Sequence, residues 1–133
     1  MCGAPAIKPG RAVRRCMANA HRVGVADRVR LVDGDMTDLP FPENSFDLVL
    51  ACLSVHNLHP SSRREKAMLE AVRVLRPGGR IAVVDIYGTK TYLSVLVAAG
   101  MRHPRRSSFL AGMFPPARAV TALEGPPPTR PRC

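Results

Sequence analysis

Apolar residues recur at helical spacing in three stretches of the chain, and each stretch predicts a helix. The three predicted helices span residues 11–23, 61–76 and 91–99. Ser61 and Ser62 stand where capping residues are expected at the start of the second helix. Gly24 and Gly100 follow the first and third helices, and glycine commonly ends a helix.

Other apolar stretches have the composition of strands. Two of them are almost unbroken, which suits strands of a parallel sheet that is covered on both faces. Two weaker ones near the end of the chain predict an antiparallel hairpin. The predicted strands span residues 28–32, 46–53, 80–86, 107–110 and 117–123. Strands that alternate with helices predict an α/β fold with a mostly parallel, Rossmann-like sheet and helices on both faces.

The length of 133 residues fits one domain. We expect an irregular N-terminus over residues 1–10, a folded domain over residues 11–124 and a proline-rich, basic tail over residues 125–133. No apolar run approaches the roughly 20 residues that span a bilayer, and residues 1–10 lack the apolar core of a signal peptide. We therefore expect a cytoplasmic protein without a membrane partner.

The net charge of +10 is unevenly distributed, because residues 31–60 carry five acidic side chains and no Lys or Arg. Elsewhere the cations are mostly Arg, spread along the chain without interleaved aromatic residues. This pattern does not predict a specific nucleic-acid interface. The four cysteines form no C-x-x-C pair and have no paired spacing with His, so the sequence predicts free thiols and no metal site.

The most specific segment runs from Asp33 to Cys52. Asp35 and Met36 follow a predicted strand, the run Leu-Pro-Phe-Pro-Glu-Asn-Ser-Phe-Asp ends at Asp47, and a second strand then leads to Cys52. In an α/β sheet, ligands bind at the carboxyl ends of the strands. Together with the later run Leu-Arg-Pro-Gly-Gly-Arg-Ile-Ala-Val-Val, the segment resembles the class I S-adenosylmethionine-dependent methyltransferases, in particular the type 11-like domain.

The resemblance extends from about residue 14 to residue 122 and implies S-adenosylmethionine as the cofactor. It implies that Asp35 accepts a hydrogen bond from the adenine amine and that the Met36 N–H donates to a ring nitrogen. It places Cys52 and Leu53 beside the cofactor and His56 over the methyl donor. The alternatives are a turn aspartate for Asp35, a small buried apolar residue for Cys52, and a loop cap rather than a base for His56.

The start of the sequence departs from the family pattern. Family members begin with a strand that ends in a glycine-rich loop, and continue with a second strand whose terminal acid binds the ribose. Residues 1–10 contain no G-x-G pattern and no apolar strand. The resemblance therefore implies an N-terminally truncated or degenerate methyltransferase with impaired cofactor binding and an unidentified small-molecule acceptor.

In the family sheet, the two missing strands lie between the strand at residue 28 and the strand at residue 46. We expect these two strands to pair directly, or a homodimer to fill the gap, because unpaired strand edges invite association. The alternative is a loose monomer in which residues 28–32 are mobile. Two other functional classes stay open, a non-catalytic interaction module and a basic nucleic-acid binder.

Overall fold

The computed structural model describes residues 10–125, which fall into two compact units that divide between Asp33 and Gly34. The first unit contains helix α1 (Arg11–Arg22) and the short 3₁₀ helix η1 (Ala26–Arg28). Helix α1 ends where predicted, because Gly24 takes a left-handed φ of 72° and its N–H donates to the carbonyl of His21. The predictions for residues 1–9 and 126–133 lie outside the described residues.

The predicted strand over residues 28–32 is wrong. The chain leaves η1 at Val29 in an extended conformation, yet these residues form no sheet pairing in the described structure. Leu31 and Val32 are 37% and 45% exposed. Alternating apolar residues become a strand only when a neighbouring backbone supplies hydrogen-bond partners, and this segment has none among residues 10–125.

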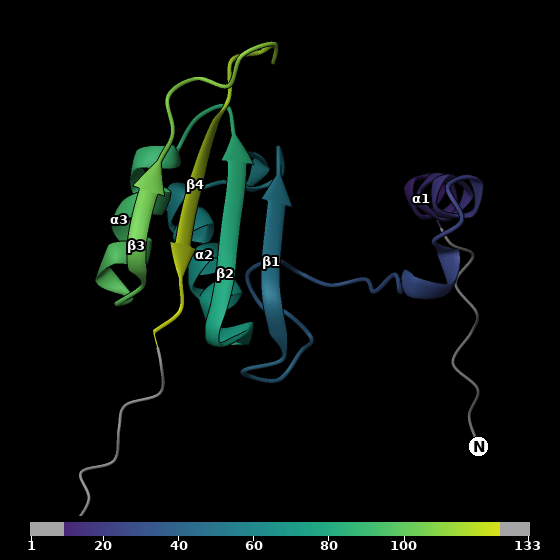
Figure 1. Ribbon diagram of the computed structural model, residues 1–133, viewed down its shortest axis with the longest axis horizontal. Coiled ribbons are helices and arrows are strands. Elements are labelled where there is room, and N and C mark those ends of the chain that lie inside the picture. The colour runs from purple at the N-terminus through teal and green to yellow at the C-terminus, as the bar shows by residue number, and fades with distance from the viewer. Residues whose placement is uncertain (1–9, 126–133) are drawn as a thin grey trace, which may run out of the picture. The chain divides into compact units, whose positions relative to one another are not determined.

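The second unit holds a four-stranded sheet in the order β1-β2-β4-β3 (Figure 1). Strands β1 and β2 are parallel, whereas β4 is antiparallel to both β2 and β3. The strands are β1 (Phe46–Cys52), β2 (Leu75–Asp85), β3 (Arg102–Arg106) and β4 (Arg118–Leu123). The α/β class is confirmed, and the last two strands form the predicted antiparallel hairpin. The predicted strand over residues 107–110 is wrong, because β3 ends at Arg106, before that range begins, whereas β4 lies within its predicted range of 117–123. Only one of the three pairings is parallel, because the hairpin supplies half of the strands.

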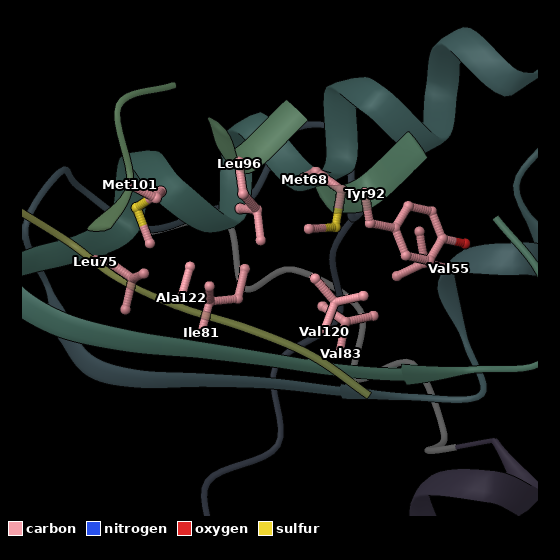
Figure 2. Close-up of a cluster of buried hydrophobic side chains, with 10 residues drawn as sticks. All are labelled: Val55, Met68, Leu75, Ile81, Val83, Tyr92, Leu96, Met101, Val120 and Ala122. Carbon is pink, nitrogen blue, oxygen red and sulfur yellow. The ribbon is translucent and has the colours of Figure 1, made fainter. Parts of the chain in front are cut away.

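Two helices cover the same face of this sheet, α2 (Ser61–Val74) and α3 (Thr89–Ala98). Their buried side chains meet those of the strands in one apolar core (Figure 2). The largest buried side chains of the core are Tyr92, Met68, Leu75, Ile81 and Leu96. No helix of residues 34–125 lies on the opposite face, where Leu48 and Leu50 are 50% and 69% exposed. Within this unit, the expected cover of helices on both faces is thus not found.

The start of α2 and the start of β2 differ from the sequence prediction. Pro60, not a serine, is the N-cap of α2, and no side chain caps this end. Strand β2 begins at Leu75, so the Pro-Gly-Gly turn interrupts the strand instead of preceding it. Gly78 has a φ of 82°, and a Cβ on Gly79 would lie 2.8 Å from the carbonyl oxygen of Arg76. Both glycines therefore serve the backbone.

Candidate functional site at the carboxyl ends of β1 and β2

Asp35 organises the loop that precedes β1. Its Oδ1 accepts hydrogen bonds from the backbone N–H and the hydroxyl of Thr37, each at 2.8 Å. Its Oδ2 forms an ion pair with Arg63 at 3.1 Å. The hydrogen bonds from Thr37 lower the pKa of Asp35 below its ordinary value, and the positive charge of Arg63 adds to this. Asp35 is thus a turn aspartate whose half-exposed carboxylate stays ionised.

Helix α2, which carries Arg63, also holds the later residues of this loop. Glu70 accepts the backbone N–H of Leu39 at 2.7 Å, and Arg73 donates to the carbonyls of Leu39 and Phe41 at 3.1 and 2.9 Å. Arg73 also binds both carboxylate oxygens of Glu70, at 2.7 and 2.8 Å. This pairing lowers the pKa of Glu70 to about 2. We did not predict this clamp from the sequence, where its only signal is an acid and an arginine three residues apart on a predicted helix.

A cavity of about 220 Å³ lies between this loop, β1 and α2. Met36 and Leu39 line it from the loop, and Cys52 lines it from the end of β1. Most of its other lining residues are apolar side chains of β1, α2 and β2. The structure therefore brings Met36 and Cys52 together at one cavity, with Asp35 next to Met36 in the chain.

Leu53 and His56 do not line this cavity. Leu53 turns the chain at the end of β1 with a left-handed φ of 51°, and its N–H donates to the carbonyl of Val84 at 2.8 Å. Its side chain is 39% exposed. The following turn, η2 (Val55–Asn57), carries His56 to the end of β2.

Asp85, the last residue of β2, is completely buried and binds His56 twice. It accepts the backbone N–H of His56 at 3.0 Å and also a short hydrogen bond from His56 Nδ1. A carboxylate can only accept, so the proton of the neutral imidazole lies on Nδ1 and Nε2 is an acceptor. His56 thus caps its loop, as one alternative held, and also presents a ring nitrogen that can take up a proton.

Two tyrosines complete the surroundings of this pair. The buried hydroxyl of Tyr92 donates to Asp85 at 3.2 Å. Burial, and then the negative charge of Asp85, raise the pKa of Tyr92 well above its ordinary value. The ring of Tyr87 lies edge-on to His56 with 5.4 Å between centroids, and its hydroxyl donates to the His56 carbonyl at 2.7 Å. We did not predict Asp85, Tyr87 and Tyr92 as site residues, although a single acid at the end of an apolar strand is a usable signal in the sequence.

Residues 10–125 contain no group of three or more His, Cys, Asp or Glu side chains that could hold a metal ion. Cys16 and Cys52 are free thiols. No helix in the described part of the chain is both long enough and apolar enough to cross a membrane.

Comparisons with known proteins agree on one family. The family described as "Methyltransferase domain" matches residues 9–83, more than half of the chain. Over 62 residues, the chain is 42% identical to the ubiquinone/menaquinone biosynthesis C-methyltransferase UbiE of Azotobacter vinelandii. These aligned residues make up 47% of this chain and 23% of that protein. The chain is 41% identical over 73 residues to the 27-O-demethylrifamycin SV methyltransferase of Amycolatopsis mediterranei, covering 55% of this chain and 26% of that protein. The chain thus spans about a quarter of the length of these relatives.

Solved structures show the same fold at low sequence identity. A SAM-dependent methyltransferase from Aquifex aeolicus superposes with a TM-score of 0.61 and 18% identity, covering 84% of this chain and 62% of that chain. The N-methyltransferase NodS from Bradyrhizobium japonicum, in complex with S-adenosyl-L-homocysteine, superposes with a TM-score of 0.60 and 15% identity, covering 77% of this chain and 61% of that chain.

Proposed function

This chain belongs to the methyltransferase domain family of class I S-adenosylmethionine-dependent enzymes. From that premise, we propose that it takes part in methyl transfer from S-adenosylmethionine to a small-molecule acceptor. One observation carries the proposal. The loop that contains Asp35 and Met36, the end of β1 at Cys52 and the His56–Asp85 pair all lie at the carboxyl ends of two parallel strands, where α/β folds bind ligands.

The apolar cavity at Met36 and Cys52 would receive the adenine end of the cofactor. Its volume of about 220 Å³ is below the roughly 300–1,000 Å³ of whole ligand pockets, so it fits a part of the cofactor and not the whole. The Met36 N–H would donate to a ring nitrogen, and Asp35 Oδ2 would accept from the exocyclic amine. The half-exposed carboxylate of Asp35 leaves room for this contact beside Arg63.

His56 would serve the acceptor. When bound, S-adenosylmethionine supplies a methyl group that its sulfonium already activates, so the protein contributes position and one proton acceptor. His56 Nε2 would take the proton from the acceptor group as that group forms its bond to the methyl carbon. Asp85 holds the imidazole in the tautomer that this role requires.

The first prediction concerns the affinity of the 133-residue chain. We expect weak binding, because no two of the ten glycines stand in G-x-G spacing and the cavity accommodates only part of the cofactor. Calorimetric titration with S-adenosylmethionine measures it. A dissociation constant near 1 μM, about −8 kcal/mol, would contradict this account of the site.

Substitutions at Asp35 test the adenine contact. We expect Asp35→Ala to weaken binding by about 1–2 kcal/mol, because one hydrogen bond to the ligand is lost. Asp35→Asn keeps a side-chain oxygen that can accept the hydrogen bonds from Thr37, but it removes the negative charge. Comparing the two variants therefore separates the effect of a disordered loop from the effect of a lost carboxylate. Asp38→Ala removes an exposed acid of the same loop and is the matched control. Equal affinities for the wild type and both Asp35 variants would restrict Asp35 to its role in the turn.

A further inference from the structure

We propose that a second cavity, beside the first turn of α3, binds an aromatic molecule that carries an oxyanion, and that the methyl acceptor belongs to this chemical class. The cavity has a volume of about 640 Å³ and is open to solvent. The side chains that carry the inference are Tyr87, Lys90, Arg106, Phe109 and Arg118. The assignment to the acceptor rests on the proposed function, whereas the ligand class rests on the cavity alone.

The charge of the cavity favours an anion. Three of its lining residues are cationic, and no lining residue is acidic. Among residues 10–125, the ion pairs of the structure involve none of Lys90, Arg106 and Arg118. Three like charges around one cavity repel one another, and a bound oxyanion would relieve that repulsion. Arginine is also the side chain best suited to bind carboxylate or phosphate through two parallel hydrogen bonds.

Neutral partners hold both arginines in place. Arg106 Nε donates to the hydroxyl of Thr89 at 2.8 Å, which orients the guanidinium without neutralising it. Arg118 lies 3.9 Å above the ring of Phe109 and donates to the carbonyl of Ser107 at 3.1 Å. Because these contacts occupy only part of each guanidinium, further N–H groups remain to bind an anion.

Two aromatic rings at the same cavity explain why the anion should be part of an aromatic molecule. Tyr87 is 43% exposed and Phe109 is 59% exposed. Both are lining residues of the polar cavity. An aromatic ligand would remove apolar ring surface from water and stack against these side chains.

The position of the cavity connects it to the methyl-transfer site. Tyr87 follows the end of β2 by two residues and contacts both His56 and the cavity. A molecule bound against Tyr87 would therefore lie next to the imidazole that accepts the proton. The two cavities would thus hold the adenine end of the cofactor and an anionic, aromatic acceptor separately.

Chemical-shift titrations of the 133-residue chain test the ligand class without the cofactor. The probes are benzoate and phenyl phosphate, with benzyl alcohol as the neutral ring and inorganic phosphate as the anion without a ring. We expect both oxyanion-bearing rings to shift the signals of residues 86–91, and each comparison probe to bind about tenfold more weakly. Equal binding of benzyl alcohol and benzoate would overturn the role of the charge, and equal binding of inorganic phosphate and phenyl phosphate would overturn the role of the ring.

Matched variants locate the site. Lys90→Gln should weaken benzoate binding about tenfold, because it removes one charge-assisted contact from an exposed helical position. Arg105→Gln removes an exposed cation from β3 that does not line the cavity, and it should leave binding unchanged. Equal effects of the two variants would overturn the proposal.

Separate titrations with S-adenosylmethionine and with benzoate distinguish a failure of this inference from a failure of the proposed function. If S-adenosylmethionine shifts residues of the first cavity while benzoate shifts none of the second, the inference fails and the proposed function stands. If benzoate binds as described and S-adenosylmethionine does not bind, the ligand class is supported and the proposed function fails.

Discussion

Asp85 is the residue on which the site geometry depends most. It accepts four hydrogen bonds, two from His56 and one each from Ile86 and Tyr92, although its side chain is completely buried. A buried carboxylate is tolerated only when its oxygens are satisfied in this way. The same contacts join the end of β2 to the His56 loop and to α3, so the packing of the core and the orientation of the imidazole are coupled.

Removal of one of these donors should therefore lower stability measurably. We expect Tyr92→Phe to reduce the free energy of unfolding by about 1–2 kcal/mol, because the Tyr92 hydroxyl donates to a buried carboxylate. Urea denaturation followed by circular dichroism measures this change. Tyr87→Phe is the control, since that hydroxyl is exposed and binds a backbone carbonyl. An equal decrease in the free energy of unfolding for the two variants would contradict the stabilising role of the hydrogen bond from Tyr92 to Asp85.

At the scale of elements, the loop of residues 34–41 has little secondary structure and is held in place by its neighbour α2. The bonds from Glu70 and Arg73 to Leu39 and Phe41 link residues more than thirty positions apart in the sequence. Because this loop carries Asp35 and Met36, helix α2 positions the adenine side of the proposed cofactor site, and its own apolar side chains also line the cavity.

The pH dependence of this clamp follows from Glu70. Its folded pKa of about 2 lies below its ordinary value of 4.5, so its contribution is complete above about pH 4.5 and is lost as the pH falls through about 2. We expect the Leu39 amide to exchange its hydrogen more slowly in the wild type than in Glu70→Gln at pH 6, and the difference to shrink towards pH 3. Glu65→Gln, an exposed position on the same helix, should match the wild type. A difference between wild type and Glu70→Gln that stays constant with pH would contradict this explanation.

At the scale of the whole molecule, β1 pairs with β2 along one edge only. Its outer edge has no strand partner among residues 10–125, and Leu48 and Leu50 expose apolar surface on the face that lacks α2 and α3. An unpaired edge next to exposed leucines favours pairing with another chain. A homodimer, one of the two arrangements that we expected from the sequence, thus remains a proposal.

Light scattering during size-exclusion chromatography tests this proposal. We expect association that increases with protein concentration, and Leu50→Lys should weaken it about tenfold, since a charge would be buried at the contact. Leu69→Lys places the same charge at a leucine of α2 that is 51% exposed and is the matched control. A monomer at every concentration, or equal effects of the two variants, would contradict the proposal.

The sequence predicted local features far better than those that depend on distant contacts. Helices α1, α2 and α3 and strand β1 lie close to their predicted ranges, because apolar spacing and glycine stops act over a few residues. The failed strand at residues 28–32 depends on a neighbouring strand that apolar spacing cannot supply. Likewise, Met36 and Cys52 were placed at one site by the family resemblance, whereas Asp85, Tyr87 and the Glu70–Arg73 clamp are brought to the site by tertiary packing.

The position of the cofactor site is tested most directly by chemical-shift mapping with S-adenosylhomocysteine, the chemically stable product of methyl transfer. At millimolar ligand even a weak complex is populated, so affinity does not limit the experiment. We expect the largest shifts on Asp35, Met36 and Cys52, around the cavity at the end of β1. Shifts centred on β3 and β4, or no shifts at residues 35–56 at saturating ligand, would contradict it.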